Sequence, residues 1–99
     1  MTIEEFQHSL RKLKEPPENL PELLRALWYD AKNDWDKAHS ISQEVGTRDG
    51  SWVHAYLHRK EGDLGNARYW YGRAGRPESQ VPLQAEWEQI VLHLCSAAE

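Results

Sequence analysis

Apolar residues recur every three or four positions through most of this chain, a spacing that places side chains on one face of an α-helix. No segment alternates apolar and polar residues as a half-buried β-strand does. Two stripes lie near the ends of the chain: Ile3, Phe6, Leu10 and Leu13 form the first, and Leu83, Trp87, Ile90, Val91, Leu94 and Ala98 form the last. The pattern predicts an all-α protein.

Capping and turn residues divide this pattern into six predicted helices. Thr2 and Glu5 have the spacing of a capping box at the start of the first helix, and Pro16-Pro17 ends it. We expect the remaining helices to begin after Asn19, Asp34, Asp49 or Ser51, Asp63, and near Pro82. Stops are predicted at Asn33, Gly46, Gly62 and Gly75.

Two segments of the chain repeat one another at an offset of 29 residues. Residues 26–38 align with residues 55–67 without a gap, and the pairs include Ala26 with Ala55, Asn33 with Gly62, Asp34 with Asp63, and Ala38 with Ala67. A residue that tolerates positive φ, a capping Asp, a large apolar residue and then Ala are typical of a tight helical hairpin. The repeat predicts two such hairpins, at about 20–46 and 49–77.

The second copy resembles the tetratricopeptide repeat in the segment Gly62–Ala74, where small or aromatic residues stand at Ala67, Tyr71 and Ala74. Ala55 matches a small position of that motif, and Pro77 follows it. The resemblance implies two stacked hairpins with the first and last helices as caps, because repeats need covered ends. The string His54–Gly75 is also similar to a stretch of small bacterial proteins, a likeness that implies no activity.

Length and composition fit one folded domain spanning residues 1–99. Five Trp and four Tyr supply large apolar surfaces for a small core. The formal net charge of −4 argues against general affinity for nucleic acid. One cysteine, Cys95, excludes an internal disulfide. We find no signal peptide or membrane-spanning run in the sequence and expect a cytoplasmic protein.

Positive charge gathers in the second predicted hairpin, where residues 48–76 hold six Lys or Arg and three Asp or Glu. The tetratricopeptide resemblance implies that one face of the fourth helix lines a concave groove. The predicted partner-binding residues are Trp52, Tyr56, Arg59, Lys60, Arg68 and Tyr69. Guanidinium groups beside aromatic rings suit a protein or acidic-peptide partner. A solvated face is the alternative, and a homodimer that continues the stack is a further hypothesis.

Three histidines form a second candidate site. His54 and His58 are four residues apart and share one helical face, as two metal-ligating imidazoles must. His39 lies on the preceding helix and is the third candidate ligand. Residue 55 is Ala, so the pair lacks the Glu of the metalloprotease signature. The alternative is a structural pair hydrogen-bonded to backbone or to Asp.

These patterns favour a non-enzymatic, tetratricopeptide-like interaction module without a cofactor. The competing hypothesis is a small metal-binding protein or metal-dependent hydrolase that holds a divalent transition metal at His54, His58 and His39. The direction of the three imidazole rings distinguishes the two: nitrogens that converge on solvent or an ion favour the metal, and nitrogens that face backbone carbonyls oppose it.

Overall fold

The structure, a computed structural model, describes residues 1–97, and Ala98 of the predicted last stripe lies outside them. This part of the chain contains helices and no strand, so the all-α prediction is confirmed. The helices are α1 (Ile3–Lys12), α2 (Glu22–Ala31), α3 (Trp35–Gln43), α4 (Arg48–Glu61), α5 (Leu64–Ala74) and α6 (Leu83–Ala97).

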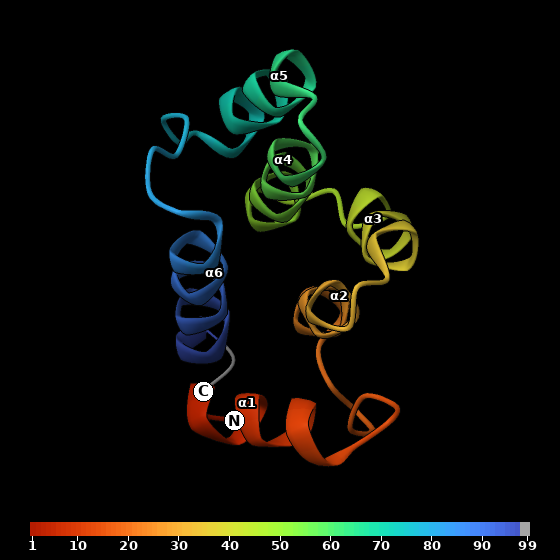
Figure 1. The fold of residues 1–99 in the computed structure, drawn as a ribbon. Coiled ribbons are helices and arrows are strands. Elements are labelled where there is room, and N and C mark those ends of the chain that lie inside the picture. Colours follow the sequence, from red (N-terminus) through yellow and green to blue (C-terminus); the bar gives the residue numbers. More distant parts are fainter. Residues whose placement is uncertain (98–99) are drawn as a thin grey trace.

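The helices follow one another around an arc that the last helix closes (Figure 1). Each of α2, α3 and α4 packs against the next helix in sequence, and α4 with α5 and α2 with α3 share the most extensive contacts. An irregular segment then returns the chain to α6, which contacts α2 and α4, and α1 packs against α6. The first and last helices therefore close the inner side of the arc.

The two turns related by the 29-residue offset have the same conformation. Asn33 (φ 66°) and Gly62 (φ 91°) both adopt the left-handed region. The next residue caps the following helix in each copy: Asp34 accepts a hydrogen bond from the Lys37 amide at 3.1 Å, and Asp63 accepts one from the Asn66 amide at 3.3 Å. The repeated sequence thus encodes a repeated helix–turn–helix, since turn and cap are local interactions.

Helix starts were predicted correctly at Thr2, where both bonds of the capping box form, and incorrectly at two other places. Asn19 does not cap α2; it has φ 63°, and the N-cap position is Pro21, which has no side-chain cap. The fourth helix begins before Asp49 and Ser51, because Thr47 accepts a hydrogen bond from the Gly50 amide at 3.0 Å. A short polar side chain caps wherever the chain turns, and the sequence offers several of them.

Gly50 lets the connection between α3 and α4 pass close to the first turn of α4. A Cβ atom at this position would lie 2.1 Å from the backbone oxygen of Val45. No side chain fits such a contact without moving backbone, so glycine is required by space rather than by φ. The close passage fixes how α3 lies beside α4.

A single apolar core joins all six helices. Phe6 of α1 and Trp87 of α6 are buried with their ring centroids 5.8 Å apart. Polar atoms of the buried indoles are satisfied across the helices: Trp87 Nε1 donates to the Leu27 carbonyl at 3.2 Å, and Trp28 Nε1 donates to Ser9 Oγ at 3.1 Å. Because their polar atoms are paired, these large rings can be buried without a hydrogen-bonding penalty.

The Glu86 carboxylate of α6 is buried at the centre of a polar network, with 1% of the residue exposed. Its Oε2 accepts from Trp52 Nε1 at 3.1 Å and from the Tyr71 hydroxyl at 2.6 Å. Its Oε1 accepts from an Arg59 guanidinium nitrogen at 2.9 Å. Burial and this carboxylate raise the pKa of Tyr71, which keeps the hydroxyl protonated as a donor. One side chain therefore ties α4, α5 and α6 together.

Glu86→Ala is expected to lower the free energy of unfolding by about 3–5 kcal/mol, because it leaves the Arg59 charge without its buried partner. Urea denaturation followed by circular dichroism measures the loss. Glu88→Ala on the same helix is the matched control, and we expect it to cost less than about 1 kcal/mol. Equal losses in the two variants would show that Glu86 is not the centre of the network.

Candidate metal centre

Two aromatic residues predicted to bind a partner are buried inside the arc. Trp52 is 5% exposed and Tyr56 is 2% exposed. Trp52 donates to Glu86, and the Tyr56 hydroxyl donates to Asp30 Oδ2 at 2.8 Å. The prediction that these rings line an accessible groove is wrong, because α6 returns against α4 and covers that face.

The two basic residues assigned to the same face are bound to buried carboxylates. Arg59 pairs with Glu86 and also donates to the Val81 carbonyl, and Lys60 Nζ lies 2.9 Å from Asp30 Oδ1. Both acids are almost fully buried, so these cations satisfy charges inside the molecule. The predicted surface therefore loses Arg59 and Lys60 as free contacts, and their charges have a structural role.

Arg68 and Tyr69, both on α5, are predicted partner residues that lie at the surface and do not pair with a buried carboxylate. Tyr69 is 56% exposed, and its hydroxyl accepts from Arg73 at 3.1 Å. Arg68 lies 3.2 Å from an exposed carboxylate oxygen of Glu78. The six residues do not form one free surface, because Trp52 and Tyr56 are buried and Arg59 and Lys60 are paired with buried carboxylates.

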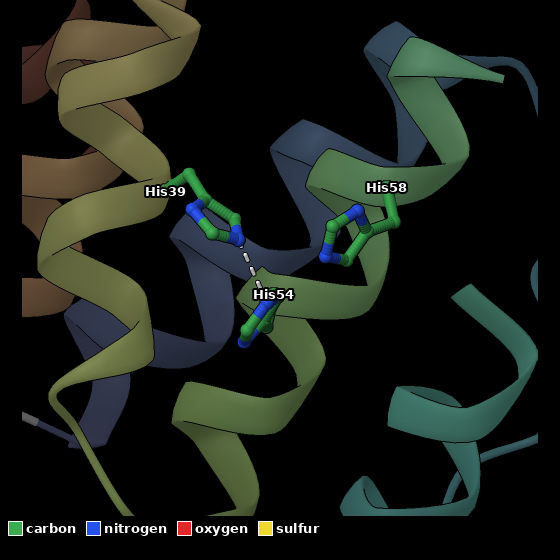
Figure 2. Close-up of side chains that lie close together, drawn as sticks. All are labelled: His39, His54 and His58. Carbon is green, nitrogen blue, oxygen red and sulfur yellow. Dashed lines mark hydrogen bonds between the residues drawn. The ribbon is translucent and has the colours of Figure 1, made fainter. Parts of the chain in front are cut away.

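The three histidines converge between α3 and α4 (Figure 2). One ring nitrogen from each of His39, His54 and His58 lies within 4.8 Å of the others. His39 Nε2 and His54 Nε2 are 3.0 Å apart. The four-residue spacing places His54 and His58 on one side of α4, and the packing of α3 against α4 brings His39 opposite them. The fold thus assembles the triad that the sequence predicted.

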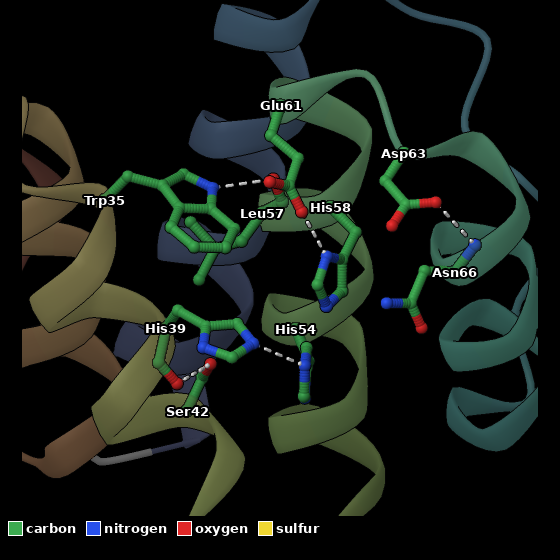
Figure 3. A network of polar contacts seen from close by, with 9 residues as sticks. All are labelled: Trp35, His39, Ser42, His54, Leu57, His58, Glu61, Asp63 and Asn66. Carbon is green, nitrogen blue, oxygen red and sulfur yellow. Dashed lines mark hydrogen bonds and ion pairs between the residues drawn. The ribbon is translucent and has the colours of Figure 1, made fainter.

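Indole rings hold the imidazoles in place. Trp35 stacks on His39 with ring centroids 4.8 Å apart, and Trp70 of α5 stacks on His54 at 4.0 Å. Trp35 is itself fixed by a hydrogen bond from Nε1 to the Leu57 carbonyl at 2.8 Å (Figure 3). The rings at 54 and 58 stack at 4.7 Å. These contacts leave the imidazoles little rotational freedom, which preorganises their nitrogens.

Glu61 sets the tautomer of His58. His58 Nδ1 lies 2.6 Å from Glu61 Oε2 (Figure 3), and a carboxylate only accepts, so Nδ1 carries the proton. Nε2 of the neutral ring then presents a lone pair, and Figure 3 shows it on the side of the other two histidines. Across residues 1–97 no buried side-chain nitrogen lacks a hydrogen-bond partner. His58 Nε2 makes no such bond, so it reaches solvent-accessible space.

The surroundings favour the neutral form of His39 and His54. Burial, with the neighbouring His39 and His58, lowers the pKa of His54 to about 4. Burial and the adjacent His58 likewise lower the pKa of His39. Neutral imidazole is the form that ligates metals, so near pH 7 a metal meets little competition from protons at these two rings.

Two parts of this site were not predicted from the sequence. Glu61 follows His58 by three residues on α4, a spacing that could have indicated the contact. Trp70 lies on another helix, and nothing local in the sequence pairs it with His54. The alternative prediction is of structural histidines bonded to backbone or Asp; both His54 and His58 are buried, and their nitrogens contact Glu61 and His39 rather than backbone or Asp.

Compared with protein-family models, curated proteins and solved structures, the chain matches none of them. Within the described residues, no helix has the length and apolar character needed to cross a membrane. The histidine geometry is thus the main observation about function.

Acidification is expected to destabilise the protein through His54. The unfolded chain takes up a proton near the ordinary pKa of 6.5, whereas the folded chain resists until about pH 4. The stability is therefore fully present above pH 6.5 and is lost as the pH falls toward 4, about 2 kcal/mol of it by pH 5. Urea denaturation at pH 7.5 and 5 measures the loss.

His54→Gln removes this titration, so its free energy of unfolding should fall less on acidification than that of the parent. His8→Gln, at an exposed position of α1, should keep the parent's pH dependence. A stability difference between His54→Gln and the parent that is the same at both pH values would contradict the assignment.

Proposed function

We propose that this protein binds a divalent transition metal, with Zn²⁺ as the best fit, through His39, His54 and His58. The observation that supports the proposal is the convergence of one ring nitrogen from each within 4.8 Å. Imidazole is a ligand that Zn²⁺, Cu²⁺, Ni²⁺ and Co²⁺ share. Zn²⁺ also accepts tetrahedral geometry without an energetic preference for another arrangement.

The distances suit a small ion. Tetrahedral Zn–N bonds of about 2.0–2.1 Å separate ligand nitrogens by roughly 3.3 Å. The two Nε2 atoms of His39 and His54 are already 3.0 Å apart. One of them must carry the proton shared in that contact, and the other ring, whose Nε2 accepts, already holds its proton on Nδ1. To bind a metal through both Nε2 atoms, only the donor ring has to shift its proton from Nε2 to Nδ1. Binding is thereby coupled to tautomer choice rather than to refolding.

Glu61 supplies the outer support that histidine ligands commonly have. A carboxylate that accepts the Nδ1–H proton orients the ring and raises the basicity of Nε2. The 2.6 Å contact with His58 has this form. Three protein ligands leave the fourth tetrahedral position open for water or another ligand, as at catalytic zinc sites.

The interaction-module hypothesis has less support. Its predicted surface retains Arg68 and Tyr69, since Trp52 and Tyr56 are buried and Arg59 and Lys60 are paired inside. The hydrolase variant of the metal hypothesis needs a general base, and Glu61 already binds His58. The proposal is therefore metal binding alone, and it assigns no hydrolytic reaction to the open coordination position.

Titration of tag-free, chelator-stripped protein with Co²⁺ tests the proposal, because tetrahedral Co²⁺ reports its ligands through visible absorption. We expect one equivalent to bind, and Zn²⁺ to displace it. Glu61→Gln should weaken binding by about 10–100-fold. His58→Gln, which removes a ligand, should weaken it more.

His8→Gln is the control, since this exposed histidine of α1 should not affect binding. Circular dichroism confirms that each variant is folded before titration. A parent protein that gives no tetrahedral spectrum, or a His58→Gln variant that binds as tightly as His8→Gln, would refute the site.

A further inference from the structure

A hollow of about 310 Å³ adjoins the metal centre, and His54 forms part of its wall. Residues of the connection from α3 to α4 line it together with Trp70 and Arg73 of α5. Its polar lining includes Ser42, Gln43, Thr47, Arg48, Ser51 and Arg73. No Asp or Glu is among the lining residues, although the whole chain has a net charge of −4.

Both arginines of the hollow are available to a ligand. Within residues 1–97, no carboxylate oxygen lies in ion-pair distance of Arg48 or Arg73, whereas Arg59 and Arg68 are each paired. Arg73 is held beside Trp70, with its guanidinium carbon 5.5 Å from the ring centroid, and bonds the Tyr69 hydroxyl. Its remaining N–H groups can donate to an anion in the fixed geometry of a guanidinium.

Ser51 adds a buried donor to the same wall. It is 8% exposed, and its hydroxyl makes no hydrogen bond with any described residue. Since every fully buried side-chain oxygen of these residues has a partner, the Ser51 hydroxyl must reach accessible space, and the hollow is the space that Ser51 lines. A hydroxyl that faces such a hollow and has no protein partner can bond a ligand oxygen or water.

We infer that this hollow binds an oxyanion, a carboxylate or phosphate group, next to the metal. One part of the inference rests on the proposed metal site, namely that an ion bound at His54 adds positive charge beside the hollow and strengthens anion binding. Two unpaired guanidinium groups, a buried hydroxyl and a metal favour a doubly charged oxyanion over a neutral ligand. The metal centre would then act on, or be regulated by, a phosphorylated or carboxylated molecule.

Titration of inorganic phosphate and of acetate into metal-free and Co²⁺-loaded protein, followed by ¹H–¹⁵N spectra, tests the inference. We expect phosphate to shift the Ser51 amide and the Trp70 indole resonances in both forms. Its affinity should be higher for the Co²⁺-loaded form than for the metal-free form. Arg48→Gln and Arg73→Gln should each weaken phosphate binding roughly tenfold, because each removes charge-assisted hydrogen bonds. A larger effect of acetate than of phosphate would assign the hollow to carboxylates.

Arg68→Gln is the matched control, because Arg68 is on α5 with Arg73 but outside the hollow and paired with Glu78. The oxyanion site would be overturned if neither anion shifted the Ser51 or Trp70 resonances. It would also be overturned if all three arginine variants bound phosphate with equal affinity. Failure of Co²⁺ to bind would overturn the proposed function and the coupling to it, while the metal-free titration decides the oxyanion site by itself.

Discussion

The return of α6 against α2 and α4 is the contact on which the architecture depends. Two hairpins in an arc leave an apolar inner face that they cannot bury by themselves. Apolar side chains of α6 cover that face, and the Glu86 carboxylate specifies where they pack, since its three donors come from α4 and α5. A buried acid with three partners tolerates little displacement, so it fixes the position of α6 as well as adding stability.

Closing the arc decides where function can reside. The inner face holds buried aromatic rings and ion pairs to buried carboxylates, so the groups predicted to bind a partner there are already engaged within the molecule. The candidate metal centre lies instead where α3, α4 and α5 meet, around His54. Two sides of α4 have different roles there: Tyr56 is buried on the side of the core, and His54 and His58 face the candidate metal centre. The same helix thus supplies core and site through its period of 3.6 residues.

Local features were predictable and long-range ones were not. Apolar spacing gave the helices, and the turns at Asn33 and Gly62 follow from short-range capping rules. The histidine triad was predictable too, because it needs only one helical face and one neighbouring helix. The burial of Trp52 and Tyr56 depends on α6, more than 30 residues away in sequence for Trp52, and no local pattern encodes that contact. A basic and aromatic stretch looks the same in sequence whether it binds a partner or a buried carboxylate.

Gly50 makes the candidate site unusually dependent on a position that holds none of its ligands. Its missing side chain allows Val45 and α4 to approach, and that approach sets α3, with His39, against His54. Replacement of an imidazole removes one donor and leaves the scaffold standing. A methyl group at position 50 would instead displace the Val45 backbone, and with it the distances from His39 on α3 to His54 and His58 on α4. The geometry of the site therefore depends on a residue that offers it no atom, as well as on the three histidines.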